Sequence, residues 1–278
     1  MTLTLGFSPC PNDTFIFDAL VNGRLGTGVL RFEPLLEDVQ TLNRWALEGR
    51  LDVSKVSYGV LPRILGRYAL LESGGALGVG VGPLLVALPG KGPFDPATMT
   101  VAIPGEDTTA HLLFSLAFPG AAHKVFRVFS EIEGEVLAGR VDAGVLIHEG
   151  RFTHAAKGLH RLLDLGEHWE SVTRSPIPLG GIVARRTLGP SVRAEVDRLI
   201  RRSLELANAD RTHLSAYVRC HAQELDPDVM RQHVELYVND YSLALGEAGH
   251  RAVETLLGVW ARLHPGEERC ATSSVYSG

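Results

Sequence analysis

The stretch LAGRVDAGVLIH, residues 137–148, has a counterpart in LEGRLDVSKVSY, residues 47–58, and the two align without gaps. Both contain a leucine, then Gly-Arg, then an apolar residue and an aspartate at matching positions. A helix that ends at a glycine, followed by a short charged turn and a new strand, produces this pattern. Two such units predict two similar α/β lobes, although turns between helices and strands favour glycine and aspartate in any protein.

Eight segments have the apolar composition of strands, and helical segments separate many of them. The expected strands cover residues 3–8, 30–36, 51–57, 82–88, 100–104, 124–129, 142–148 and 180–185. A helix capped by Asn12 or Asp13 is expected to run to about Asn22, and others cover residues 37–48, 108–118 and 130–138. This alternation predicts parallel α/β sheets with helices on both faces.

The chain becomes helical from about Pro190. Apolar residues recur with helical spacing between Val192 and Ala207, which is the stripe of an amphipathic helix. Further helices are expected over residues 228–240 and 246–262. We expect this last third of the chain to pack back on one of the sheets.

Two stretches rich in glycine and proline, residues 74–83 and 175–186, are expected to carry the chain between the lobes. They define a first lobe of residues 1–88 plus 180–278, which includes the C-terminal helices. The second, inserted lobe covers residues 89–179. The predicted fold class is therefore α/β with two lobes and two crossover strands, and a ligand would bind between the lobes.

The composition excludes several classes of protein. The 278 residues carry a formal net charge of −5, which argues against nucleic acid or an anionic membrane as the main partner. The three cysteines are far apart and have neither the spacing of metal ligands nor that of a disulfide framework. This use of cysteine is typical of proteins in a reducing compartment. The N-terminus has no signal-peptide pattern, and no apolar run approaches the ~20 residues of a membrane span. We expect a cytoplasmic protein.

Ligands of open α/β sheets bind where the strands end, and several expected strands end in polar residues. The first strand leads into a proline-containing loop and a helix start, and the strand at 51–57 contains a lysine, which is costly to bury without a partner. The candidates for the cleft are Ser8, Asn12, Ser54, Lys55, Ser57, Thr108, Thr109 and His148.

Some of these candidates also have purely structural explanations. Thr108 and Thr109 fit the cap and first residue of a helix, although the same helix start is suited to a carboxylate. Lys55 would be satisfied by an ion pair with Asp52 or Glu48. Both interpretations remain open for each residue.

Cys10 is expected to be a small buried residue, because no partner base lies near it in the sequence. Considered without its surroundings, His148 would be a residue at the end of a strand with no chemical role. A chemical role is favoured because the neighbouring strands also end in polar residues. The chain has no dinucleotide-binding fingerprint, Walker A motif, zinc-protease motif or nucleophile elbow. No cofactor is predicted.

The histidines do not predict a metal site. His148, His154 and His160 recur every six residues, which fits neither one helix face nor a usual zinc spacing. His221 and His233 fall in the helical part and are expected on solvated faces.

Six blocks of the chain resemble one family of enzymes. They are GFSPCPNDTFIFDALVNGR (6–24), LEDVQTLNRWALEGRLDVSKVSYG (36–59), SGGALGVGVGPLLVA (73–87), PGEDTTAHLL (104–113), VDAGVLIHEGRFT (141–153) and YVNDYSL (237–243). Together they resemble the 1,4-dihydroxy-6-naphthoate synthases, which belong to the futalosine pathway of menaquinone biosynthesis. The resemblance implies a fold like that of type II periplasmic binding proteins, used by a cytoplasmic enzyme of the carbon-carbon lyase type. The implied substrate is cyclic dehypoxanthine futalosine, with no cofactor or metal, and the products are 1,4-dihydroxy-6-naphthoate and a sugar-derived fragment.

The resemblance also implies the site residues. The catalytic histidine of the family falls on His148, as a proton acceptor. The implied substrate contacts fall on Ser54, Lys55, Val56, Thr109 and Ala110. Ser54 stands where other members carry threonine, and it keeps the hydroxyl. The tail beyond about residue 262 matches nothing in the family.

In the mechanism that follows, neutral His148 removes a proton from the substrate and starts the bond cleavage that aromatises the ring system. The substrate carboxylate would lie near Thr109 or Lys55. Glu149 is expected to face solvent, because strand neighbours point to opposite faces, or else to orient the imidazole. The internal alignment places Tyr58 opposite His148.

Two other functions compete with this one. The first is a non-catalytic solute-binding protein of the same fold, which a missing signal sequence disfavours. The second is a related chorismate dehydratase, which the blocks PCPNDTF and LIHE disfavour.

Overall fold

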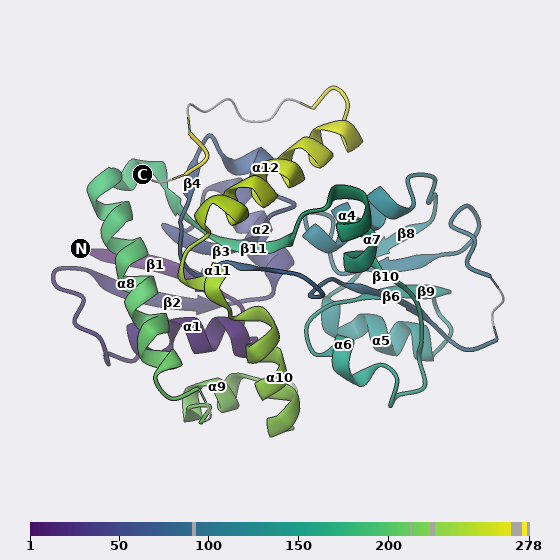
Figure 1. Ribbon diagram of the computed structural model, residues 1–278, viewed down its shortest axis with the longest axis horizontal. Coiled ribbons are helices and arrows are strands. Elements are labelled where there is room, and N and C mark those ends of the chain that lie inside the picture. Colours follow the sequence, from purple (N-terminus) through teal and green to yellow (C-terminus); the bar gives the residue numbers. More distant parts are fainter. Residues whose placement is uncertain (91–92, 212, 223–225, 268–273, 277–278) are drawn as a thin grey trace.

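Two separate β-sheets organise the chain, and each forms the centre of one lobe (Figure 1). The computed structural model describes residues 1–90, 93–211, 213–222, 226–267 and 274–276. The lobes lie side by side, with the N-terminal strands and the long C-terminal helices in one of them. Cys270 lies outside the described residues.

The first sheet has the order β2-β1-β3-β11-β4, and β5 pairs with β11. Its strands are β1 (Thr2–Phe7), β2 (Arg31–Leu36), β3 (Val53–Ser57), β4 (Tyr68–Leu70), β5 (Ala76–Gly78) and β11 (Ile177–Arg185). Strand β1 is parallel to β2 and β3, whereas β11 is antiparallel to β3, β4 and β5.

The second sheet has the order β10-β6-β9-β7-β8. Its strands are β6 (Leu84–Ala87), β7 (Val101–Ile103), β8 (Lys124–Phe126), β9 (Ala143–Leu146) and β10 (His160–Asp164). Strand β7 is parallel to β8 and β9, whereas β6 is antiparallel to β9 and β10. Both sheets are thus mixed, and the parallel pairing we expected holds for three strands of each.

The two sheets repeat one plan, as the internal alignment predicts. The order β2-β1-β3-β11 in the first sheet corresponds to β8-β7-β9-β6 in the second. The aligned aspartates also make the same contact: the backbone N–H of Thr4 donates to Asp52 at 3.0 Å, and that of Thr100 donates to Asp142 at 2.9 Å. Asp52 therefore joins the start of β3 to β1, and Asp142 joins the start of β9 to β7.

Strand pairing locates the crossings between the sheets. Strand β5 pairs in the first sheet and β6 in the second, so the chain crosses within residues 79–83; it returns between β10 and β11, within residues 165–176. The division into lobes at residues 88 and 180 stays a prediction. By strand pairing alone, residues 84–87 go with the second lobe and 177–179 with the first.

Helices cover both sheets and reach across the lobes. Helices α8 (Pro190–Asn208), α9 (Ala216–His221) and α10 (Pro227–Tyr237) pack against α1 (Pro11–Val21). Helix α12 (Gly246–Leu263) packs against α3 (Leu61–Ile64) and β11 of the first lobe and against α4 (Thr109–Ala117) of the second. The remaining helices are α2 (Val39–Glu48), α5 (Phe129–Leu137), α6 (Gly150–Thr153), α7 (Leu165–Thr173), α11 (Asp240–Leu243) and the 3-10 turn Arg186–Leu188.

Most of the long elements lie where the sequence predicts them, and so do the short strands β7 and β8. Strands β4, β5 and β10 and helices α3, α6, α7, α9 and α11 were not expected, because most of them are too short to show a clear period. The expected cap of α1 is wrong. Cys10 occupies the cap position without a side-chain hydrogen bond, and Pro11 begins the helix.

Part of the C-terminal tail adds to the first sheet. Tyr276 forms a parallel bridge with Leu70 of β4, and the backbone N–H of Leu70 donates to the carbonyl of Val275. Among the described helices, none has the length and apolar character needed to cross a membrane.

Candidate active site

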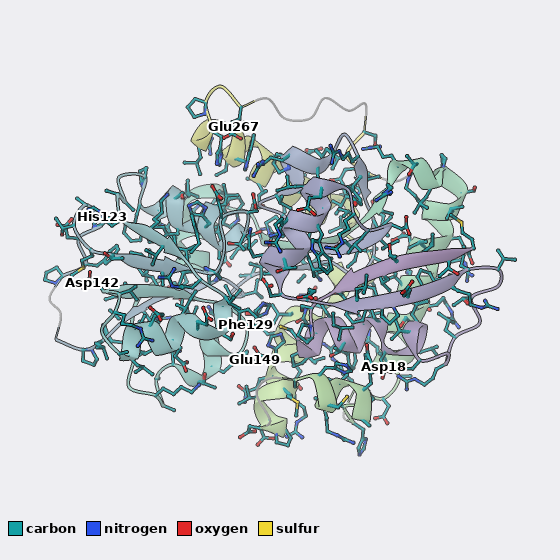
Figure 2. The ribbon with its side chains drawn as sticks, turned by 180° about the vertical axis from the view of Figure 1, so that it is seen from behind. Asp18, His123, Phe129, Asp142, Glu149 and Glu267 are labelled. Atoms are coloured by element: carbon teal, nitrogen blue, oxygen red, sulfur yellow. The ribbon has the colours of Figure 1, made fainter. Side chains whose placement is uncertain are left out.

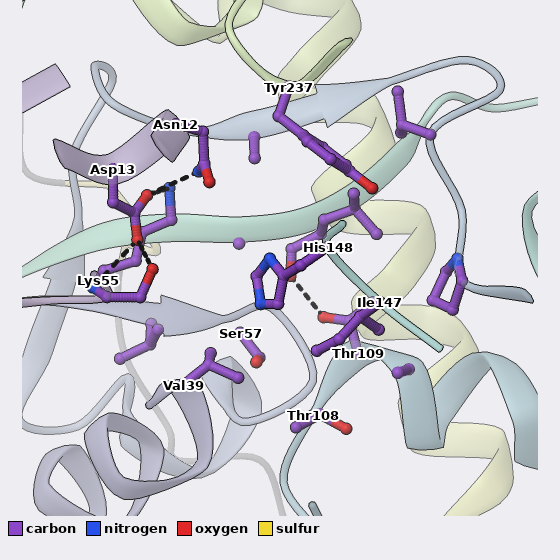
Figure 3. Close-up of a pocket in the computed structure, with 18 residues that line it drawn as sticks. Asn12, Asp13, Val39, Lys55, Ser57, Thr108, Thr109, Ile147, His148 and Tyr237 are labelled. Atoms are coloured by element: carbon purple, nitrogen blue, oxygen red, sulfur yellow. Dashed lines mark hydrogen bonds and ion pairs between the residues drawn. The ribbon is translucent and has the colours of Figure 1, made fainter. Parts of the chain in front are cut away.

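A cavity lies between the lobes, and the strand ends and helix starts named above surround it (Figure 3). Its residues come from strands β3, β5 and β11 of the first sheet, from the segments around the starts of α1, α2 and α4, from the end of α10, from the first crossing and from the loop after β9. They are Ser8, Asn12, Asp13, Val39, Lys55, Val56, Ser57, Ala76, Val81, Pro83, Thr108, Thr109, Ala110, Ile147, His148, Leu179, Gly180 and Tyr237.

The structure brings together all but one of the candidate residues. Ser54 is fully buried and does not line the cavity. Its hydroxyl donates to the carbonyl of Lys55 at 3.0 Å and lies beside Gly6 of β1. Tyr58, which the alignment places opposite His148, is also buried away from the cavity.

Lys55 forms a buried ion pair with Asp13. The Lys55 Nζ lies 3.0 Å from Asp13 Oδ1, and the two side chains are 6% and 3% exposed. The ammonium also donates to the carbonyl of Gly74 at 2.9 Å, while Ser8 Oγ and Asn12 Nδ2 donate to the carboxylate of Asp13, each at 2.8 Å. Both charges therefore have the hydrogen bonds that burial demands.

The expected partners of Lys55 were the wrong ones. Asp52 accepts hydrogen bonds from the backbone N–H and hydroxyl of Thr4 instead. Asp52 stands close to Lys55 in the sequence, but the side chain that reaches Lys55 comes from the start of α1 (Figure 3).

His148 lies at the cavity just after β9, with a left-handed backbone at φ 55°. This conformation is uncommon for a residue with a side chain and often marks a functional position. The imidazole contacts the edge of Phe129, with ring centroids 4.8 Å apart, and its buried Nε2 has no hydrogen-bond partner in the described chain. Burial lowers the pKa of His148 below its ordinary value of 6.5, although Glu149 and Asp13 act in the opposite direction.

His233 belongs to this site, and the expectation that it lies on a solvated face is wrong. Its side chain is 0% exposed and stacks on His148, with ring centroids 5.8 Å apart. Its Nε2 lies 2.8 Å from Asn12 Oδ1. The sequence did contain a signal, because His233 shares a helical stripe with Met230, Val234 and Tyr237, all of them buried.

Glu149 is buried as well, at 8% exposed, so the expectation that it faces solvent is wrong. The strand ends at Leu146, and Glu149 already precedes α6 in a helical conformation. The alternation of strand side chains therefore does not apply to it.

Cys10 is buried, as expected, and burial raises the pKa of its thiol well above the ordinary value. A thiol held neutral in this way is a poor nucleophile. Among the described residues, no group of three or more histidine, cysteine or acidic side chains is arranged to hold a metal ion.

The two threonines at the start of α4 have different structural roles. Thr108 caps the helix, and its hydroxyl accepts from the backbone N–H of His111 at 3.2 Å. The Thr109 hydroxyl joins the lobes: it donates to the carbonyl of Leu179 at 2.7 Å and accepts from the N–H of Gly59 at 3.0 Å. The backbone N–H groups of the first helical turn have no partner inside the helix, so they suit an anion.

Comparisons with known proteins show the family to which the chain belongs. The chain matches the family model described as menaquinone biosynthesis over residues 3–262. The chain belongs to this menaquinone biosynthesis family. The resemblance of the six sequence blocks is thereby confirmed.

Two relatives of the menaquinone biosynthesis family cover most of the chain. The 1,4-dihydroxy-6-naphtoate synthase of Thermus thermophilus is 50% identical over 255 residues, which cover 91% of this chain and 92% of the relative. The enzyme of the same name from Streptomyces coelicolor is 47% identical over 261 residues, which cover 92% of each chain.

Solved structures confirm the predicted fold class. A crystal structure of a protein from Archaeoglobus fulgidus is similar with a TM-score of 0.88 and 32% identity, covering 94% of this chain and 97% of that one. The periplasmic aliphatic sulphonate-binding protein of Escherichia coli is similar with a TM-score of 0.65 and 12% identity, covering 97% and 90%. The latter likeness concerns the fold alone, which is that of periplasmic binding proteins.

Proposed function

We propose that this chain converts cyclic dehypoxanthine futalosine to 1,4-dihydroxy-6-naphthoate, with His148 as the general base. Membership of the menaquinone biosynthesis family and the names of the two relatives support this reaction. The observation that carries the role of His148 is its position at the inter-lobe cavity with a bare ring nitrogen. A neutral imidazole has one ring nitrogen without a hydrogen, and that nitrogen can accept a proton.

In the proposed reaction His148 removes a proton from the substrate. Its lowered pKa keeps the imidazole neutral at pH 7, so a lone pair is available. The proton moves from a substrate carbon to the ring nitrogen, and the electron pair left on the substrate drives the cleavage that releases the sugar-derived fragment. Aromatisation of the product supplies the driving force, and a well-placed base contributes about 10²- to 10⁴-fold to such a step.

The start of α4 is the proposed binding place for the substrate carboxylate. The N–H groups of Thr109 and Ala110 begin this helix at the cavity, where the positive end of the helix dipole favours an anion. Lys55 adds a positive charge, although Asp13 already balances it. The family's contact at Ser54 stays a prediction.

Asp107 is expected to hold the lobes together during turnover. It exchanges two hydrogen bonds with the Gln40 side chain, at 3.0 and 3.1 Å, and forms an ion pair with Arg63. Asp107→Ala removes the hydrogen bond from Gln40 Nε2 and the ion pair with Arg63, but it keeps the bond that the backbone N–H of residue 107 donates. Because each lost interaction contributes about 0.5–1.5 kcal/mol, kcat/KM should fall about tenfold. Steady-state kinetics measure this, with the neighbouring exposed Glu106→Ala as control. Equal values for both variants would contradict the role.

The fall of kcat/KM at acid pH should report the protonation of His148. A base with a lowered pKa loses activity only when the pH falls through that pKa, so kcat/KM should decline below about pH 6.5 and level off above it. Measurement of kcat/KM across pH 5–8 tests this. A midpoint above the ordinary histidine value would contradict the assignment.

The direct test of function is turnover by the purified protein. Mixed with cyclic dehypoxanthine futalosine, it should release 1,4-dihydroxy-6-naphthoate, which absorbance and chromatography detect. Binding without product would favour the solute-binding alternative, and turnover of chorismate would favour the dehydratase. The cytoplasmic location stays a prediction.

A further inference from the structure

Three neighbouring buried atoms at the junction of the lobes have no hydrogen-bond partner in the described chain. They are Nε2 of His148, Oε1 of Glu149 and Nδ1 of His233. Figure 2 shows Glu149 and Phe129 close together where the lobes meet. Unpaired buried polar atoms are rare in folded proteins, so their clustering calls for an explanation.

The hydrogen-bond network fixes the state of His233. Asn12 Nδ2 donates to Asp13 Oδ1 at 2.8 Å, which sets the orientation of the amide and turns its Oδ1 toward His233. An amide oxygen only accepts, so His233 Nε2 must carry the hydrogen. Burial holds the pKa of His233 well below its ordinary value, so the ring is neutral and its Nδ1 is a bare acceptor.

Glu149 faces this bare acceptor. Its Oε1 lies 3.8 Å from His233 Nδ1, so two acceptors approach each other with no donor between them. No cationic side chain in the described chain pairs with Glu149. The other nearby carboxylate, Asp13, is balanced by Lys55 at 3.0 Å.

We propose that Glu149 is the counter-charge for His148 when the imidazole carries the proton taken from the substrate, and that neutral His233 keeps the Glu149 carboxylate bare for this role. The inference rests on the proposed function of His148. When the proton moves, a C–H bond of the substrate breaks, an N–H bond forms on His148 and the ring becomes positive. In this proposal the carboxylate of Glu149 balances the new positive charge. Glu149 and His233 are positioning residues, since neither lines the cavity.

Other titratable groups near His148 and Glu149 do not supply this charge. Tyr237 and Cys10 are buried, and burial raises the pKa of each above its ordinary value, so both stay neutral. The groups that face the pair from the surrounding elements are Cys10, Asp13, Lys55, His233 and Tyr237. Among these five the charged groups are Asp13 and Lys55, which pair with each other. Two further cations lie near Glu149 and pair with other carboxylates: Lys157, which lines the outer pocket with Glu149, pairs with Glu133, and Arg151 pairs with Asp164.

The test compares Glu149→Gln, which keeps the shape and removes the charge, with Glu149→Asp, which keeps the charge. Nuclear magnetic resonance of ring-labelled histidines in the substrate-free protein gives the pKa of His148. We expect it to fall in Glu149→Gln and to return toward the wild-type value in Glu149→Asp. In turnover, kcat of Glu149→Gln should fall about tenfold, the factor that corresponds to one pKa unit.

The matched control is Glu133→Gln. Glu133 lines the same outer pocket as Glu149, but it pairs with Lys157 at 2.7 Å, so its loss should leave the pKa of His148 unchanged. An unchanged pKa of His148 in folded Glu149→Gln would overturn the inference, as would equal losses of kcat in the Gln and Asp variants. If Glu149→Gln does not fold, Glu149→Ala, which also removes the charge, has to lower the pKa of His148 instead. A wild-type protein that turns over no substrate would defeat the proposed function, while the titration would still test the counter-charge.

Discussion

Replacement of His148 by alanine should lower kcat by about 10²- to 10⁴-fold, the contribution of a well-placed general base. The variant removes the ring nitrogen at the cavity that has no hydrogen-bond partner. The remaining lining residues and the start of α4 are untouched, so KM should change much less than kcat. Steady-state release of 1,4-dihydroxy-6-naphthoate measures both constants.

A matched control for this prediction is His154→Ala. His154 follows α6 in the same lobe, its Nδ1 contacts the carbonyl of Arg151, and it does not line the cavity. This variant should keep near-wild-type kcat. If His148→Ala retained it too, with an unchanged circular dichroism spectrum, His148 would not be the base.

Replacement of Lys55 by methionine should destabilise the fold by about 3–5 kcal/mol, because it leaves the buried Asp13 carboxylate without its positive partner. The hydrogen bonds from Ser8 and Asn12 remain, but they do not cancel a full charge at a site that water barely reaches. Urea denaturation followed by circular dichroism measures the loss.

Two comparisons show whether the charge causes this loss. The double variant Asp13→Asn, Lys55→Met removes both charges and should recover part of the stability. Arg198→Met breaks an exposed pair with Glu195 and should cost less than about 1 kcal/mol. A loss for Lys55→Met no larger than that for Arg198→Met would mean that the buried pair contributes little.

Most of the fold could be predicted from the sequence, because apolar residues in the long helices and strands recur with the period of the element. The repeated helix end, turn and strand around Asp52 and Asp142 are local features, and each aspartate holds the same place in its sheet. Strands β4, β5 and β10 have three to five residues, too few for alternation to stand out. Their positions depend on pairing with distant strands, which no local pattern reports.

Less of the candidate site could be predicted from the sequence, because its contacts join segments that lie far apart in the chain. Lys55 pairs with Asp13 and not with the nearer Asp52. His233 comes from α10 and stacks on His148, and a polar residue on this helix looks exposed until its apolar neighbours on the same face are considered. Glu149 was misplaced because the strand was expected to continue to His148, whereas it ends at Leu146.

The two crossings between the sheets also set the order in which the lobes mature during synthesis. Strand β3 pairs with β11, and residues 58–176 separate the two strands in the chain. All strands of the second sheet leave the ribosome before β11 does, so the inserted lobe can complete its sheet first. Until then the edge of β3 stays unpaired, and an unpaired edge is open to wrong partners. The N-terminal lobe is therefore the last to close, although its synthesis starts first.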